Sequence, residues 1–160
     1  MTDHAPAVHS PLELEHFLPY RLSILSNTIS QEIAHDYQQR YALSVTEWRV
    51  MAVLARFESL SAGEVAQRTA MDKVAVSRAL ARLVASGRVI RRTHAGDKRR
   101  SVLRLSARGW KIHDAVAPLA RAHETGLLAR LDADERAWLE RILNKLAAGT
   151  HPNVNGPSHE

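Results

Sequence analysis

The chain has 160 residues, of which 45% are hydrophobic, and a formal net charge of +5. It contains no cysteine, which excludes disulfides, thiolate metal sites and thiol-based redox sensing. No apolar run approaches the roughly 20 residues that span a bilayer, and residues 1–16 lack the basic and apolar regions of a secretion signal. We therefore expect a cytoplasmic protein without membrane contact, built as one domain or one domain with an appended helical dimerisation element.

The positive charge is concentrated in the middle of the chain. Residues 61–108 hold 12 Lys and Arg against 3 Asp and Glu, a net charge of +9, whereas residues 1–60 carry −3 and residues 109–160 carry −1. A local basic field of this size is typical of proteins that bind polyanions. An Arg-rich solvated surface gives the same count, because 18 of the 22 cations are Arg. Charge alone therefore leaves the two interpretations about equally plausible.

The first part of the chain predicts one long helix. Residues 1–10 are expected to be disordered, a helical period begins at Leu12, and Pro19 suits the first turn of a helix. Apolar residues then recur at spacings of three and four, namely Leu22, Leu25, Ile29, Ile33 and Tyr37. A striped helix this long in a small chain usually packs against something outside its own domain.

Helix-start signals divide the middle of the chain into short helices. Ser44 precedes Glu47 by three residues, and Ser61 precedes Glu64 by three, which is the spacing of a capping box. The first signal predicts a helix that carries Trp48, Met51 and Phe57. The second predicts a short helix that ends near residue 69.

A helix-turn-helix follows from the next signals. Asp72 is the expected N-cap of a helix over 73–86, and Gly87 is a suitable residue just after its end. Two helices joined by a turn of about three residues form this motif. Two β-prone runs, 88–93 and 100–105, then surround a polar turn and predict a hairpin.

The C-terminal part predicts two more helices. Ser106 caps a long helix over 107–130, and Asp132 with Glu135 has the spacing of another capping box. The last helix carries a stripe of leucines and isoleucine and should end near Gly149. The tail over 150–160 is rich in Pro, Asn, Gly and His and is expected to be disordered.

The helix over 73–86 has an apolar and a polar face. Val76, Leu80 and Leu83 mark the buried face, and the outer face carries Lys73, Ser77, Arg78 and Arg82. Arg and Lys can donate to guanine or to phosphate, and Ser suits either role, so this face could read a DNA major groove. A solvated amphipathic helix has the same pattern, and on this helix alone the interpretations are equal.

The hairpin favours the DNA interpretation. Asp97 lies two residues before Arg99, so the carboxylate can fix the direction of the guanidinium. An oriented Arg at a basic hairpin tip suits a narrow, negative minor groove. As a simple surface ion pair the two residues would contribute only about 0–1 kcal/mol. Further cations surround the pair, namely Arg92, Lys98 and Arg100.

Together these residues resemble the MarR family of bacterial transcriptional regulators. The resemblance rests on Asp97-x-Arg99 followed by Val102-Leu103-Arg104-Leu105-Ser106-x-x-Gly109, and on Leu60-Ser61…Val65-Ala66, Asp72-Lys73-x-x-Val76-Ser77-Arg78 and Leu83-Val84-x-x-Gly87-x-Val89-x-Arg91. It covers about residues 12–148. One departure is Ser106, where the family more often has Thr. Both residues cap helices, so the departure changes little.

The resemblance implies a mainly α fold with a small β-hairpin wing. Residues 44–106 would form a winged helix-turn-helix lobe, and residues 12–40 and 107–148 a helical dimerisation region. The implied protein is a homodimer on pseudo-palindromic double-stranded DNA, a repressor that a small ligand, often an aromatic acid or phenol, releases. We expect the DNA contacts to be Ser61, Lys73, Ser77, Arg78, Arg82, Arg92, Asp97, Lys98, Arg99 and Arg100.

An effector pocket is expected where the dimerisation helices meet the lobe. Its candidate residues offer an apolar floor, aromatic walls and a cation: His16, Tyr20, Arg21, Ile24, Trp48 and Met51. Core packing is the simpler interpretation of Trp48 and Met51 taken singly. Arg21 is the strongest candidate, because an Arg among apolar residues needs an anion. We expect an anionic aromatic effector, either a free aromatic acid or an aryl thioester of coenzyme A.

Other functions have weaker support in the sequence. None of the nine His has tight metal-ligand spacing, and no nucleophile–base pair, phosphate loop or useful carboxylate pair appears. We therefore expect no catalytic residue, no metal and no cofactor. Two alternatives stay open: a ligand-independent DNA-binding or architectural protein of the same fold, and a metal-responsive regulator.

Overall fold

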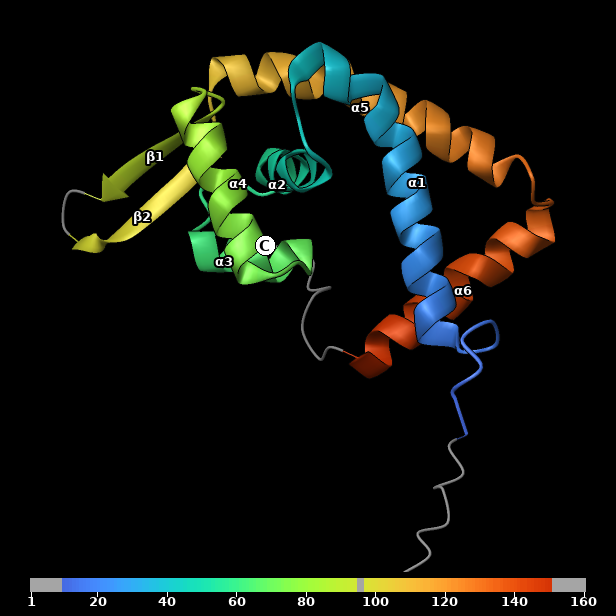
Figure 1. Ribbon diagram of the computed structural model, residues 1–160. Coiled ribbons are helices and arrows are strands. Elements are labelled where there is room, and N and C mark those ends of the chain that lie inside the picture. Colours follow the sequence, from blue (N-terminus) through green and yellow to red (C-terminus); the bar gives the residue numbers. More distant parts are fainter. Residues whose placement is uncertain (1–9, 95–96, 151–160) are drawn as a thin grey trace, which may run out of the picture.

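The described part of the chain forms six helices and one two-stranded hairpin, which confirms the predicted fold class. The computed structural model describes the backbone of residues 10–94 and 97–150, and their side chains except those of 93–100 and 150. The elements are α1 (Leu18–Tyr41), α2 (Val45–Arg56), α3 (Ala62–Thr69), α4 (Lys73–Ala85), β1 (Val89–His94), β2 (Asp97–Leu105), α5 (Ala107–Leu128) and α6 (Ala133–Thr150). In Figure 1, α2 to α4 and the hairpin form one half, α1 and α6 lie in the other, and α5 runs along both. The ends predicted to be disordered fall almost entirely outside the described residues.

The predicted helix starts are confirmed. In both boxes the Ser hydroxyl accepts from the Glu backbone N–H, and the Glu carboxylate accepts from the Ser backbone N–H, at Ser44–Glu47 and at Ser61–Glu64. Asp72 accepts from the backbone N–H groups of residues 74 and 75, and Gly87 adopts a positive φ of 67° after α4. Because these signals act over three or four residues, the sequence alone could locate them.

The hairpin completes the core of the lobe. β1 and β2 are antiparallel, with Val89 opposite Leu105 and Arg91 opposite Leu103. Leu103 is fully buried, and its backbone N–H donates to the carbonyl of Leu60 at 2.7 Å. The core joins the apolar faces of α2 to α4 to this edge: Val50, Met51, Leu54, Val65, Val76, Ala79, Leu80, Leu83 and Leu103. The second strand begins at Asp97, three residues earlier than predicted, so it includes the basic run.

The start of α5 touches the turn that leaves α4. The Ser106 hydroxyl accepts from the Gly109 backbone N–H at 2.9 Å and donates to the Gly87 carbonyl at 2.6 Å. A Cβ on Gly109 would lie 2.1 Å from the carbonyl oxygen of Arg88. Since no side chain fits there, glycine sets the distance between α5 and the helix-turn-helix.

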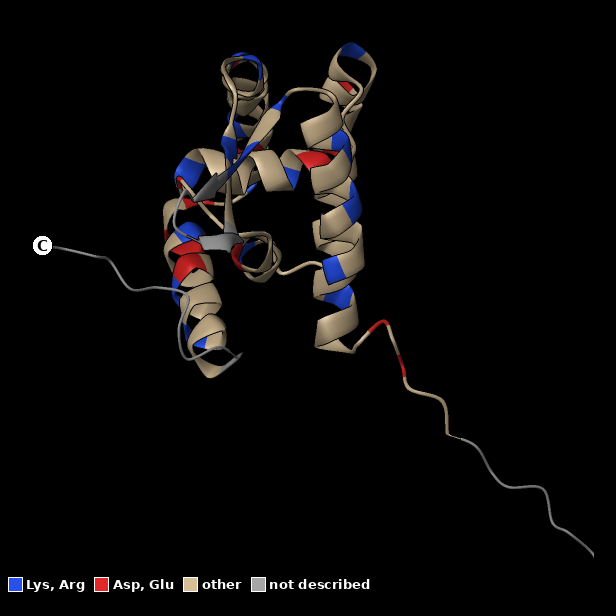
Figure 2. Cartoon of the chain, turned by 90° about the vertical axis from the view of Figure 1, so that its left-hand side faces the viewer, with Lys and Arg blue, Asp and Glu red and all other residues tan. Residues whose placement is uncertain are grey.

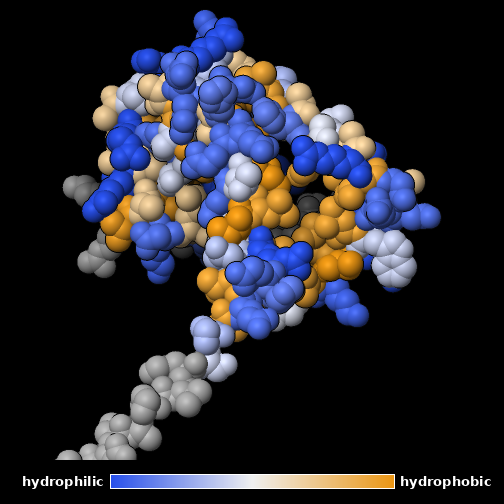
Figure 3. All heavy atoms as spheres, turned by 45° about the vertical axis from the view of Figure 1, so that its right-hand side comes forward, coloured by the Kyte–Doolittle hydropathy of each residue, from blue (hydrophilic) through white to orange (hydrophobic). Residues whose placement is uncertain are grey.

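The long outer helices bury little of their surface in a single chain. No described side chain of α6 is buried, and α1 buries only Ala34 and Tyr37. Large apolar side chains of α6 are exposed, with Trp138 at 55% and Ile142 at 50%. Figure 3, which turns the α1 and α6 side forward, shows hydrophobic residues gathered across this face. Within the described residues, no helix is long and apolar enough to cross a membrane.

Gly109→Ala should lower the free energy of unfolding by about 3 kcal/mol, because the new methyl group collides with a backbone carbonyl. Gly126→Ala on the same helix is the control. A Cβ there meets no atom within 4 Å, so this change should stabilise the protein by about 0.5 to 1 kcal/mol. Urea unfolding at equal protein concentration measures both. Equal effects of the two substitutions would show that the Gly109 contact is not tight.

Candidate nucleic-acid interface

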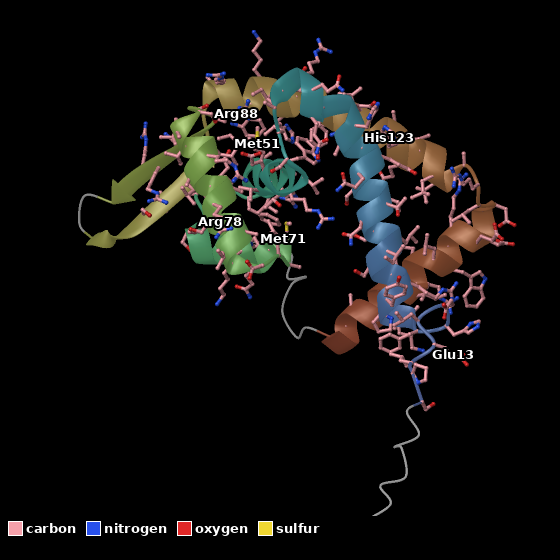
Figure 4. All side chains as sticks on the ribbon, viewed as in Figure 1. Glu13, Met51, Met71, Arg78, Arg88 and His123 are labelled. Carbon is pink, nitrogen blue, oxygen red and sulfur yellow. The ribbon has the colours of Figure 1, made fainter. Side chains whose placement is uncertain are left out.

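The outer face of α4 is polar, basic and open. Lys73, Ser77 and Arg78 are exposed, and Figure 4 shows Arg78 at the part of α4 near α3. Val74 shares this face at spacings of three and four and is 56% exposed. Sequence reasoning missed Val74 as a candidate, although its spacing from Ser77 and Arg78 could have identified it. An exposed apolar group beside cations suits a thymine methyl group.

Arg82, a predicted DNA contact, forms an ion pair within the protein. Its Nε donates to Oε1 of Glu47 at 3.0 Å, and the Glu47 side chain is only 8% exposed, against 57% for Arg82. This ion pair joins α4 to α2. Arg82 therefore orients α4, and its contact with DNA stays a prediction, because more than half of its side chain is open to solvent.

The Glu47 carboxylate is held in its charged form. Burial acts to raise its pKa, but hydrogen bonds from Ser44 and the charge and hydrogen bond of Arg82 outweigh that effect, so the pKa lies below its usual value of 4.5. A carboxyl group with a lowered pKa stabilises the fold above the pKa of the unfolded chain, and this contribution is lost as pH falls.

The hairpin presents at least one predicted cation outward. Arg92 is exposed on β1 and lies opposite Val102, on the strand face away from Leu103. The other four predicted wing residues, Asp97, Lys98, Arg99 and Arg100, lie on the backbone of β2, but their side chains are outside the described residues. Figure 2, seen from the hairpin side, shows more Lys and Arg than Asp and Glu along the facing elements. Ser61 is partly exposed as the N-cap of α3.

Arg88 belongs to the basic segment but serves the fold. It is 9% exposed, and its guanidinium donates to the backbone carbonyls of Tyr41 and Ala42 at the end of α1. The described cations of residues 61–108 therefore include surface residues on α4 and β1, one that forms an ion pair with α2 and one that is buried.

The six predicted effector residues do not meet within one chain. Met51 is fully buried in the core, and Trp48 packs between the rings of Tyr37 and His113, at centroid distances of 5.8 and 5.7 Å. Arg21 lies 16 residues before Tyr37 on α1, roughly 24 Å along the helix. His16, Tyr20 and Ile24 lie at the same N-terminal end, far from Met51 in Figure 4, where Glu13 marks that end. One chain therefore does not bring the six residues together, because α1 separates them, and the pocket stays a prediction for an assembly with a second copy.

The histidines of the dimerisation helices have other partners. His123 lies 2.7 Å from Asp36 and joins α5 to α1, and His113 stacks on Trp48. The described residues contain no group of three or more His, Asp or Glu that could hold a metal ion.

Comparison with known proteins adds a family to this geometry. A sequence model of the MarR family matches residues 43–100, from the start of α2 into the hairpin. Residues 43–100 are therefore a MarR-family segment, in agreement with the resemblance of the sequence. The chain is 28% identical over 130 residues to the transcriptional regulator HosA of Escherichia coli O157:H7, which covers 76% of this chain and 96% of HosA. It is 27% identical over 106 residues to an HTH-type transcriptional repressor of Mycobacterium tuberculosis, covering 66% of this chain and 76% of the repressor.

Solved structures share the fold of this MarR-family regulator. A mutant MarR from E. coli complexed with operator DNA superposes with a TM-score of 0.72 at 26% identity, covering 86% of this chain and 99% of that chain. The PcaV regulator of Streptomyces coelicolor, in complex with its natural ligand, has a TM-score of 0.72 at 19% identity, with coverage of 89% and 100%. The sequence-based identification of the family is confirmed, and the chain is a DNA-binding transcriptional regulator of this family.

Glu47→Gln should make unfolding stability less dependent on pH between about pH 6 and pH 3, because the variant has no carboxylate to protonate. At neutral pH it should cost about 1 kcal/mol, since the amide keeps only part of the bonding to Ser44 and Arg82. Glu58→Gln, at an exposed carboxylate, is the control and should leave the pH profile unchanged. Chemical unfolding at a series of pH values tests this, and parallel profiles for wild type and Glu47→Gln would contradict it.

Proposed function

We propose that this MarR-family regulator is a repressor that binds a pseudo-palindromic operator as a homodimer and leaves it when a small anionic aromatic ligand binds. The observation that carries the DNA part is the open basic face of α4 beside a basic hairpin. The operator complex of the E. coli MarR mutant, which has the same fold, supports it. The repressor from M. tuberculosis supports the direction of regulation.

In this proposal α4 enters the major groove. Arg78 is placed near the middle of the exposed face, with Lys73 and Val74 one turn closer to the N-terminus. Arg can form two hydrogen bonds with guanine, Lys can reach phosphate, and Val74 can contact a thymine methyl group. Arg82 and Glu47 hold α4 against α2, so the helix enters with a fixed orientation.

The hairpin would contact the adjacent minor groove or the sugar-phosphate backbone of the DNA. Arg99 would enter the groove with its direction set by Asp97, and the other cations of the hairpin would bind phosphates. On this basis we expect Arg99→Ala to weaken operator binding more than Asp97→Ala does.

The homodimer follows from apolar surface that one chain leaves uncovered. The exposed large apolar side chains of the outer elements are Leu12, Leu14, Phe17, Leu18, Tyr20, Leu22, Ile24, Leu25, Trp138, Leu139, Ile142, Leu143 and Leu146. All of them lie in the N-terminal part of the described chain or in α6, which gain little stability from their own chain. Because most helical stability in proteins comes from packing of an apolar face, a second copy is the expected cover of these side chains.

The effector part of the proposal rests on the ligand in a related structure and on the exposed side chains near the start of α1. The PcaV structure contains its natural ligand, which supports a small-molecule effector for this fold. One end of α1 exposes Arg21, Tyr20, Ile24 and, just before the helix, His16. Trp48 of α2 packs on Tyr37 near the other end of α1. A pocket that uses both sets therefore needs a second copy to bring them together.

Arg78→Ala should weaken operator binding by about 1–3 kcal/mol and reduce the preference over random DNA. The control is Arg121→Ala, which removes an exposed Arg from α5 and should leave affinity within about twofold. Titrations of operator and random duplexes at fixed salt measure both. An equal loss on every sequence would assign Arg78 to phosphate, and absence of operator binding by the wild type would overturn the proposed function.

Light scattering at low micromolar concentration should give twice the chain mass of 17.8 kDa. Leu143→Asp, on the exposed stripe of α6, should lower the dimer fraction or unfold the chain, because it places a charge in the proposed interface. Glu140→Ala on the same helix should leave the mass unchanged. A wild-type mass of one chain would contradict the homodimer whatever the variants do.

A further inference from the structure

A basic cavity lies between the end of α1 and the start of α5. Its volume is about 720 Å³, which is the size of sites for small organic ligands. Nine described residues line it, four of them cationic and none acidic: Gln39, Arg40, Tyr41, Ala42, Arg88, Arg108, Lys111, Ile112 and Ala115. It shares no residue with the DNA-facing surface or with the predicted effector set.

The cations of this cavity have no counter-charge in the described part of the chain. The three described ion pairs involve Glu47, Asp114 and Asp36, and none of them includes a cavity cation. Arg88 is buried, its guanidinium donates to the carbonyls of Tyr41 and Ala42, and its Nε has no hydrogen-bond partner among the described residues. A buried charge without a counter-ion is costly, so an anion in this cavity would stabilise the arrangement.

One side of the cavity is apolar. Tyr41, Ile112 and Ala115 provide a ring and aliphatic surface, and the Arg40 guanidinium lies 5.5 Å from the centre of the Tyr41 ring. A phosphate ion alone would leave this side uncovered. The cavity therefore suits an organic group joined to an anionic group, with the anion facing Arg108 and Lys111.

We propose that this cavity binds a small organic molecule with a doubly charged anionic group, such as a phosphate, beside an apolar group. Several cations around one space favour a dianion over a monoanion, because each adds a charge-assisted interaction. This inference rests on the proposed function in one respect: it places an effector site of the regulator in this cavity, separate from the pocket that would need Arg21 and Trp48 from two copies.

The position of Arg88 connects the cavity to the DNA-facing helix. The Arg88 backbone N–H donates to the carbonyl of Leu83 in α4 at 2.9 Å, and its carbonyl accepts from Ser106 at 3.0 Å. Its side chain holds the end of α1. Arg88 lies beyond the C-terminal end of α4 and Arg78 lies toward the other end (Figure 4). A ligand that changes how Arg88 holds α1 would shift the end of α1 relative to α4 without covering the DNA surface.

The binding test uses calorimetry with phenyl phosphate and benzoate on the full chain. Phenyl phosphate is mostly doubly charged above about pH 7, whereas benzoate carries one charge. We expect phenyl phosphate to bind at least about tenfold tighter than benzoate. Arg108→Ala should weaken phenyl phosphate about tenfold, since it removes a charge-assisted hydrogen bond. Arg121→Ala, on the same helix and outside the cavity, should leave binding unchanged.

Two results would overturn the assignment. One is binding of phenyl phosphate that Arg108→Ala and Arg121→Ala weaken equally, which would indicate a general effect of net charge. The other is no binding of phenyl phosphate to the wild type up to millimolar concentration. Inorganic phosphate is a third probe. If it binds as tightly as phenyl phosphate, the apolar side has no role and the proposal for an organic ligand is wrong.

The coupling test measures operator binding with and without phenyl phosphate. We expect the ligand to lower operator affinity of the wild type about fivefold or more, and of Arg108→Ala much less. If the wild type binds operator but phenyl phosphate has no effect, the effector assignment fails and the DNA-binding proposal stands. If the wild type does not bind operator, the proposed function fails, and calorimetry still decides the anion site. If Arg108→Ala weakens operator binding without any ligand, Arg108 contacts DNA and the assignment is overturned.

Discussion

The arrangement of the DNA-facing elements depends on the contact between α5 and the turn after α4. Gly109 brings the first turn of α5 against the carbonyl of Arg88, and Ser106 bonds to both sides of this junction. A backbone contact of this kind has no flexible side chain to adjust. The hairpin, α4 and the dimerisation helices are thus joined at one rigid point, and the spacing of two lobes in a dimer would be set there.

The cations of the basic segment have distinct tasks that follow from their partners. Arg78 and Arg92 face solvent and are available to a polyanion. Arg82 is bound to a carboxylate that burial and hydrogen bonds keep charged, so it fixes α4 on α2. Arg88 is buried against carbonyls at the C-terminal end of α1, where the helix dipole favours a positive charge. A net charge counts these residues equally, although Arg82 and Arg88 also bind partners within the fold.

Buried surface is distributed unevenly between the lobe and the outer helices. The lobe has a continuous core from α2 to the hairpin, whereas α6 has no buried described side chain and α1 is buried only near its C-terminal end. The same end of α1 supplies Tyr41 to the basic cavity and carbonyls to Arg88. In a dimer, movement of α1 would therefore reach the lobe through the residues that line the cavity, which is the property a ligand-controlled regulator needs.

The sequence by itself determined the local structure and the family. Capping boxes at Ser44 and Ser61, the Asp72 cap and Gly87 act within one turn of the chain, so the helix ends and the hairpin could be predicted, as could the exposed face with Arg78. The partners of Arg82 and Arg88 could not be predicted, because Glu47 and Tyr41 lie 35 and 47 residues away in the chain. The separation of the predicted effector residues within one chain could not be predicted for the same reason: composition and periodicity do not show that Arg21 lies near the start of α1, whereas Trp48 of α2 packs on Tyr37 near the other end of α1. Only the tertiary structure decides which distant side chains meet, since that depends on how the helices cross and where the backbone approaches closely, as it does at Gly109.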